Sequence, residues 1–338
     1  MNQPLFFRPT SALWWLYCAA VAIAAVYVTV KAAPSLAATT VAVGAVLPLI
    51  LITGALFAFL ALVLDPFGAR RPWLLVLAVL GGATIPAAVS LKGNEYISGV
   101  VIQMMGTEMG SAWESAFAGP ITEEWSKGLT ILLIMLIAGH VVARPIHGLV
   151  IGAFVGLGFQ VIENVLYAAN GALGDANSDL NGAWTTTVIR AVVGVSSHWV
   201  LSAMVGVAVV LLLRRRVAAG IGLFVLAWAL HFMWNAPLLG DPVGIFLKVV
   251  VILAVFAVVV GRVWRSEREF LRGRFEGFGG DATPAPAPVV PDGAARGAFL
   301  SGKERRAFLK QERKEHGRSA VKASKKQWRE LYRQLQGS

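Results

Sequence analysis

Eight long stretches of apolar residues limit what this chain can fold into. A bilayer core of about 30 Å is crossed by a helix of roughly 20 apolar residues, and a helix satisfies its own backbone hydrogen bonds in lipid. The sequence therefore predicts an all-α fold, a polytopic membrane helix bundle with about eight transmembrane helices. The expected spans are residues 13–30, 40–64, 73–90, 120–138, 147–169, 187–213, 218–236 and 244–263.

Composition agrees with a membrane protein that carries a basic tail. The 338 residues are 57% hydrophobic and 14% charged, whereas soluble globular proteins average about 45–50% apolar and about 25% charged residues. This difference excludes a soluble globular enzyme. Residues 1–261 hold 12 Lys/Arg and 10 Asp/Glu, and residues 262–338 hold 18 and 9, so the tail carries +9 of the net charge of +11.

The charge pattern divides the chain into three expected parts. Residues 1–265 form a transmembrane domain, residues 266–298 a charged and then Pro/Ala-rich linker, and residues 299–338 a basic amphipathic segment. In this last segment Trp328, Leu331 and Leu335 recur at i, i+3 and i+7, a pattern that predicts contact with anionic lipid at the membrane surface. Nucleic acid is the less favoured partner, and a solvated accessory helix is the alternative interpretation.

Basic residues in alternate loops predict the orientation of the chain. One side has the basic tail and the loop residues Arg8, Arg70, Arg71, Arg144, Arg214, Arg215 and Arg216, and the other has Lys31 and Lys92. The positive-inside rule then places both termini in the cytoplasm. Residues 91–119 become the longest outer loop, and its apolar stretch 97–105, too short to span, is expected to lie in the interface.

Few ionisable side chains lie inside the expected spans, where they are costly and usually functional. Counting about 1.5 Å per residue from the outer face, Glu123 lies roughly 6 Å deep and Glu163 about 9 Å deep. On the same scale His231 lies about 9 Å and His198 about 17 Å deep. All four side chains therefore fall in the outer half of the bilayer.

Helical phase places two of these groups on packed faces. Glu163 shares a face with one row of small residues, and His198 shares a face with another. The rows are Gly148, Gly152 and Gly156, and Gly194, Ser202 and Gly206. Small residues let helices approach closely in lipid, so both side chains are expected to point toward neighbouring helices.

Together these positions bring three carboxylates, two imidazoles and a carboxamide to similar depth: Glu123, Glu124, Glu163, His198, His231 and Asn235. Imidazole nitrogens and a carboxylate oxygen bind Zn²⁺ with one position left for water, and a further carboxylate can act as general base. Asn235, which shares a helix face with His231, can donate to a developing oxyanion. Lys127 lies at i+4 from Glu123, the orientation that favours a salt bridge.

Other interpretations fit these residues less well. Glu123 and Glu124 could be carboxylates that complement a helix N-terminus after Pro120, and a single membrane histidine is more often a satisfied polar contact. A zincin motif, His-Glu-x-x-His, is absent from the sequence, and no Asp lies within a span to form an aspartyl dyad. The serines before His198 are neighbours on one helix, whereas a serine nucleophile needs its base across a gap in space.

Four short motifs follow one another on consecutive expected spans. They are Glu-Glu-x-x-Lys at 123–127, Phe-x-x-x-Glu-Asn at 159–164, His198, and His-x-x-x-Asn at 231–235. In this order, over about residues 110–240, they resemble the PrsW family of intramembrane metalloproteases, relatives of the type II CAAX prenyl proteases. The resemblance implies a peptidase of the bacterial plasma membrane. Its substrate would be a membrane-anchored protein, such as an anti-sigma factor, cut near the extracytoplasmic face.

The resemblance also suggests a role for each residue. Glu123 or Glu124 is expected to activate water, with Lys127 orienting both carboxylates. The metal, expected to be Zn²⁺, would be held by Glu163, His198 and His231, and Asn235 would polarise the scissile carbonyl.

Two competing functions come from other classes. Membrane Glu and His residues also form proton relays in ion-coupled transporters, although the sequence lacks the internal repeat common in transporters. The second is a non-catalytic membrane scaffold that recruits cytoplasmic partners through the tail.

Overall fold

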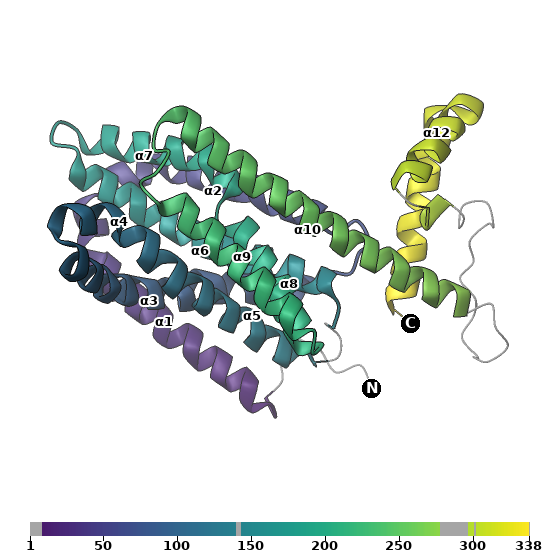
Figure 1. Cartoon of the computed structure of the whole chain (residues 1–338), viewed down its shortest axis with the longest axis horizontal. Helices are drawn as coiled ribbons and strands as arrows, with labels where there is room; N and C mark the ends of the chain where they lie inside the picture. Colours follow the sequence, from purple (N-terminus) through teal and green to yellow (C-terminus); the bar gives the residue numbers. More distant parts are fainter. Residues whose placement is uncertain (1–8, 140–142, 278–296, 301, 338) are drawn as a thin grey trace. The chain divides into compact units, whose positions relative to one another are not determined.

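The structure, a computed structural model, describes residues 9–139, 143–277, 297–300 and 302–337. These residues form helices and contain no strand (Figure 1). Seven helices among them are long and apolar enough to cross a membrane, which confirms an all-α polytopic membrane protein. They are Ala12–Ala38 (α1), Thr40–Val63 (α2), Pro72–Met105 (α3), Pro145–Gly174 (α6), Asp179–Leu213 (α7 to α8), Val217–Asn235 (α9) and Pro242–Glu276 (within α10, Pro242–Gly277).

The expected span 120–138 is not among these seven. It begins with a π-helical turn, Pro120–Glu124 (η1), and continues as Trp125–Ala138 (α5), a helix of 14 residues. The helix Thr107–Gly119 (α4) leads directly into η1, so helical residues follow one another from 107 to 138. The total of about eight spans therefore stays a prediction.

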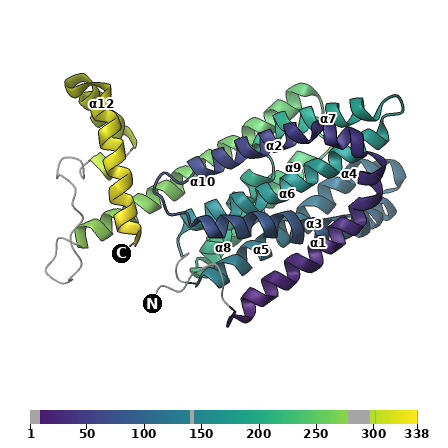
Figure 2. The same ribbon diagram turned by 180° about the vertical axis from the view of Figure 1, so that it is seen from behind.

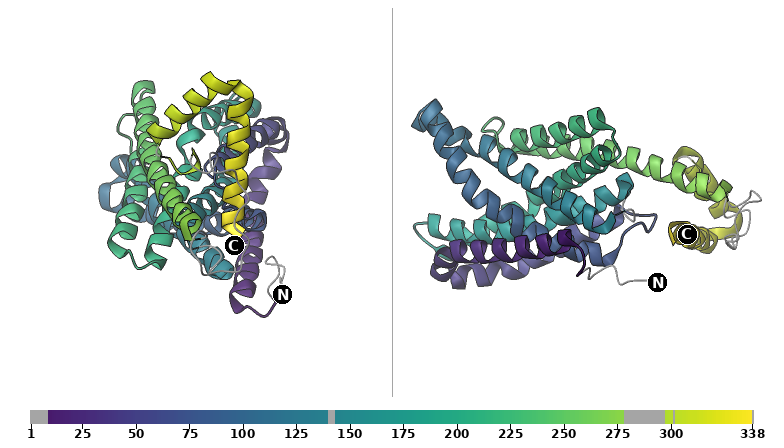
Figure 3. Two further views of the ribbon diagram at one scale, coloured as in Figure 1. Left: turned by 90° about the vertical axis from the view of Figure 1, so that its right-hand side faces the viewer. Right: turned by 90° about the horizontal axis from the view of Figure 1, so that it is seen from below.

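Residues 91–119, expected to form the longest outer loop, are helical except at Gly106, and their place outside the membrane stays a prediction. α3 continues to Met105, the chain turns at Gly106 with φ +79°, and α4 packs back against α3. A Cβ atom on Gly110 would lie 2.5 Å from Cα of Ile102, so the two helices touch through their backbones. Scattered polar residues lower the hydropathy of this helical hairpin, which lies at one end of the helix bundle (Figure 3).

α6 is the helix around which the bundle is arranged. It packs against α2, α3, α7 and α8, whereas α1 lies at the edge of the bundle beside α3 (Figure 2). Cβ atoms on three glycines of α6 would lie only 2.1–2.2 Å from backbone oxygens of α8; the pairs are Gly148–Gly206, Gly152–Ser202 and Gly156–His198. The prediction that small residues place these faces against neighbouring helices is confirmed, and the close approach brings the start of α8 against α6.

The expected span 187–213 is interrupted just before His198. α7 (Asp179–Val193) ends in a 3-10 turn, Gly194–Ser196 (η3), and α8 (His198–Leu213) begins after it. The buried side chain of Gln160 bridges this break. Its Nε2 donates to the Gly194 carbonyl at 3.1 Å, and its Oε1 accepts from the Trp199 backbone N–H at 3.4 Å. Gly194 thus lies in the break, and His198 occupies the first turn of α8.

The described residues form two compact units. We call the residues up to Leu64 together with Arg70–Val260 the membrane unit, and Asp65–Ala69 together with the residues from Gly261 onward the tail unit. The predicted boundaries at residues 265 and 298 stay predictions. The Pro/Ala-rich part of the predicted linker lies almost entirely outside the described residues, and its charged part continues α10.

The tail unit has its own aromatic and aliphatic core. Its largest helix, α12 (Gly302–Gly337), bends at Gly317, and the ring of Tyr332 lies 5.3 Å from that of Phe67 in an edge-on contact. The predicted lipid-binding residues, Trp328, Leu331 and Leu335, are at most 1% exposed. The apolar face of α12 is therefore buried within the tail unit, which corrects the expectation that this face contacts lipid.

Candidate active site

The first turn of α5 carries a buried cation, Lys127, which lies between two carboxylates of η1, Glu123 and Glu124. Lys127 Nζ lies 3.1 Å from Oε2 of Glu123 and 3.1 Å from Oε1 of Glu124. The Lys127 and Glu124 side chains are fully buried, and Glu123 is 4% exposed. The predicted salt bridge of Glu123 with Lys127 is confirmed, and Glu124 shares the same ammonium group.

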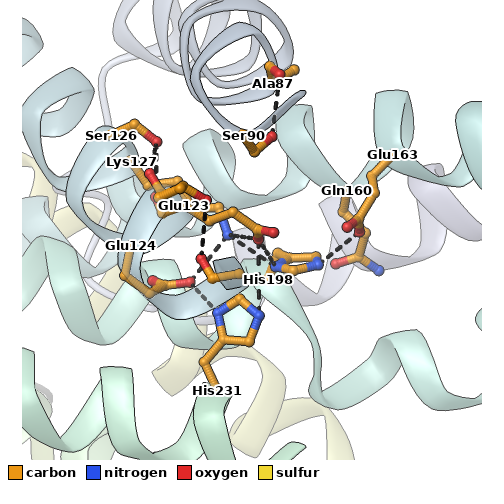
Figure 4. A network of polar contacts seen from close by, with 12 residues as sticks. Ala87, Ser90, Glu123, Glu124, Ser126, Lys127, Gln160, Glu163, His198 and His231 are labelled. Carbon is orange, nitrogen blue, oxygen red and sulfur yellow. Dashed lines mark hydrogen bonds and ion pairs between the residues drawn. The ribbon is translucent and has the colours of Figure 1, made fainter. Parts of the chain in front are cut away.

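Two histidines approach these carboxylates from other helices (Figure 4). His231, on α9, has its Nδ1 2.9 Å from Oε1 of Glu124. His198, at the start of α8, has its Nδ1 2.9 Å from Lys127 Nζ and 3.6 Å from Oε2 of Glu123. The two imidazole rings lie 5.3 Å apart, so residues that are far apart in sequence converge on one buried point.

Four of the predicted site residues form a group that could hold a metal ion. One ligand atom from each of Glu123, Glu124, His198 and His231 can be chosen so that all lie within 4.8 Å of one another. Oε2 of Glu124 is buried and has no hydrogen-bond partner among the described residues. Buried polar atoms normally have partners, and two imidazoles with two carboxylates are a donor set that Zn²⁺ accepts. The residues present therefore fit a divalent metal.

Glu163 lies beyond this group, on the far side of the His198 ring (Figure 4). Its Oε2 is 2.7 Å from Nε2 of His198, whereas Nδ1 of the same ring faces Lys127 and Glu123. The same oxygen forms an ion pair with Nη2 of Arg190. The predicted role of Glu163 as a metal ligand stays a prediction, since its carboxylate is not part of the four-residue group.

A cavity of about 410 Å³ opens beside these residues and is lined by Glu123, Glu163, His198 and His231. Asn235 also lines it, and its Nδ2 donates to the backbone carbonyl of Ser115 at 2.9 Å. The structure thus brings every predicted site residue to this cavity or, for Glu124 and Lys127, directly behind its wall.

Sequence reasoning missed Arg190 and Gln160. Arg190 lines the cavity and Gln160 holds the helix break next to His198. A charged residue inside the expected span 187–213 is the signal that identifies Arg190, because a guanidinium in lipid requires a partner. Gln160 lies between the motif residues Phe159 and Glu163, and its polarity within an apolar helix is a weaker signal.

Comparison with known proteins identifies the family to which the chain belongs. Residues 12–261 match the model of the PrsW family intramembrane metalloprotease. Neither a curated protein nor a solved structure matches the chain. The family match covers every described helix of the membrane unit and all of the predicted site residues. The chain therefore belongs to the PrsW family of intramembrane metalloproteases, which are peptidases of the membrane.

Proposed function

We propose that this peptidase hydrolyses a peptide bond of a membrane-anchored protein near the extracytoplasmic face of a bacterial plasma membrane. The observation that carries the proposal is the buried convergence of Glu123, Glu124, His198 and His231 beside a cavity. The depths expected from the sequence place these side chains in the outer half of the bilayer. An anti-sigma factor is the substrate that the family resemblance implies.

Each residue then has a role that its contacts support. His198 and His231 would hold the metal together with a carboxylate. The family resemblance implies Glu163 as that carboxylate, whereas the grouped ligand atoms favour Glu123 or Glu124. A bound Zn²⁺ would polarise the scissile carbonyl and lower the pKa of water. The remaining carboxylate of the Glu123–Glu124 pair accepts the proton of the attacking water. Lys127 fixes both carboxylates, and Asn235 donates its amide to the developing oxyanion.

The proposal predicts metal-dependent cleavage by the purified protein. In proteoliposomes with a membrane-anchored substrate we expect fragments whose new terminus, located by mass spectrometry, lies on or just within the extracytoplasmic side of the substrate's span. A strong chelator should abolish cleavage, and added Zn²⁺ should restore it. A cut on the cytoplasmic side would contradict the proposed location. Ion flux without cleavage would support the transporter interpretation, which family membership does not favour.

Both termini should lie in the cytoplasm. Arg214, Arg215 and Arg216 follow α8, and the basic tail begins at Arg262, within the second half of α10. The positive-inside rule therefore anchors both on the cytoplasmic side. Reporter fusions after residue 214 and after residue 338 should read cytoplasmic. A fusion after residue 175, between α6 and α7, should read extracytoplasmic and serves as the control. An outside reading at residue 214 or 338 would overturn the depths on which the cleavage site rests.

The tail is proposed to contact anionic lipid through charge, because its apolar face is buried. Six exposed basic residues fall within an arc of about 100° on α12 after its bend: Arg318, Lys322, Lys325, Lys326, Arg329 and Arg333. Each basic residue near an anionic surface contributes about 1 kcal/mol. We expect trypsin to cut this row several-fold more slowly in anionic than in neutral nanodiscs, and high salt to remove the difference.

A charge-reversal variant tests this lipid contact in the full chain. Lys322→Glu, Lys325→Glu and Arg329→Glu together should make tryptic cleavage at the remaining basic residues of the row independent of lipid charge. The matched control, Lys303→Glu with Lys310→Glu, changes two exposed lysines that precede the bend. Equal protection in neutral and anionic nanodiscs for the unchanged protein would show that the row does not bind lipid.

A further inference from the structure

Arg190 is held tightly by three residues of α6. Its Nη2 forms an ion pair with Oε2 of Glu163, and its Nε donates to Oδ1 of Asn164 at 2.6 Å. Its guanidinium also lies over the ring of Tyr167, 4.0 Å from the centroid. Two hydrogen bonds in different directions need the planar fork of an arginine, since a lysine offers a single point charge. The contacts therefore fix both Arg190 and the carboxylate of Glu163.

The carboxylate of Glu163 in turn contacts the imidazole ring of His198. Its Oε2 lies 2.7 Å from Nε2 of the ring, and a carboxylate at that distance requires Nε2 to carry the proton in the neutral ring. The lone pair is then on Nδ1, the nitrogen that faces Lys127 and the four-residue group. Partners of this kind orient metal-binding histidines and set their tautomer in many metal sites.

We propose that Arg190 is a positioning residue that fixes Glu163, and that Glu163 in turn holds His198 with its Nδ1 lone pair toward the metal group. This inference rests on the proposed function, and it treats Glu163 as a partner of a ligand. The helix break between α7 and α8 makes the arrangement possible. Arg190 precedes the break and His198 follows it, and both contact the same carboxylate on α6.

The first test measures metal affinity of the full chain in nanodiscs by competition with a chromophoric Zn²⁺ chelator. Arg190→Gln and Glu163→Gln should each weaken Zn²⁺ binding by about 10–100-fold, and the double variant should be no weaker than the weaker single variant. Arg190→Lys should recover part of the loss. The control, Arg262→Gln, removes an exposed guanidinium on α10 and should leave the affinity unchanged.

Two outcomes of this test would overturn the proposal. If Arg190→Gln retains wild-type Zn²⁺ affinity while Glu163→Gln loses it, Glu163 acts on the metal without Arg190. If Arg190→Gln retains wild-type Zn²⁺ affinity and, in the proteoliposome cleavage assay, raises only the KM for the substrate, Arg190 contacts substrate and does not position His198.

A second measurement separates this inference from the proposed function. The chain has five histidines, so ¹⁵N-histidine spectra of the metal-free protein in nanodiscs can be assigned by comparison with His198→Gln. We expect a proton on Nε2 of His198 in the unchanged protein and a mixture of tautomers in Arg190→Gln. A tautomer shift in a protein that neither binds Zn²⁺ nor cleaves would support the positioning role and refute the proposed function. An unaltered tautomer in Arg190→Gln would refute the positioning role.

Discussion

Glu124→Gln is expected to lower kcat/KM for cleavage of a membrane-anchored substrate by about 10²–10⁴-fold, the contribution of a positioned proton acceptor. The carboxylate contacts His231 and Lys127 through one oxygen, and its other oxygen is buried without a hydrogen-bond partner among the described residues. Glutamine keeps the shape of the side chain and removes both its charge and its basicity. The rate should be measured in proteoliposomes from the appearance of the fragment.

The same experiment tests whether the predicted residues act as one centre. Adding His231→Leu to Glu124→Gln should lower kcat/KM little further than either change alone, because residues that act as a unit give non-additive losses of activity. Glu108→Gln, an exposed carboxylate at the start of α4, is the matched control and should cleave at the normal rate. Cleavage that survives the loss of both Glu123 and Glu124 would show that these carboxylates only stabilise a helix, and the proposed mechanism would be wrong.

Lys127→Met is expected to lower the free energy of unfolding by about 3–5 kcal/mol, the usual cost of removing one partner from a buried ion pair. The ammonium group is fully buried between Glu123 and Glu124 and 2.9 Å from His198. Without it, two carboxylates remain close together in a low-dielectric environment. Unfolding in mixed detergent and denaturant, followed by tryptophan fluorescence, measures the loss.

A compensating variant distinguishes charge from shape at this position. Lys127→Met combined with Glu123→Gln and Glu124→Gln removes the cation and both anions, so most of the lost stability should return while cleavage stays absent. If Lys127→Met alone unfolds like the unchanged protein, the two carboxylates share a proton or hold another cation, and Lys127 is not needed to neutralise them.

The parts of the site that follow helical spacing could be predicted from the sequence. The Glu123–Lys127 pair depends on a separation of four residues, and the packing of α6 on α8 depends on glycines at a regular interval. Both are consequences of local geometry that any helix enforces. The convergence of the four motifs could be expected because ionisable side chains in lipid must find partners.

The remaining features depend on contacts between residues far apart in the sequence. The break before His198 is stabilised by Gln160, a residue 34 positions before Gly194, so local propensity does not locate it. The spacing of Trp328, Leu331 and Leu335 indicates that one face of α12 is apolar, but it does not say what covers that face. In the structure the partner is a core that includes Phe67, from the short segment between α2 and α3.

The π-helical turn η1 restricts the insertions and deletions that this site can tolerate. Because a π-helical turn holds one residue more than an α-helical turn, η1 acts as a one-residue insertion between α4 and α5. Removing a residue there would rotate the whole of α5 by about 100° relative to α4. Lys127 would then turn away from His198 on α8, and the apolar side chains of α5 would have to be exchanged together. Length changes in this turn should therefore be far rarer among descendants than substitutions at the same positions.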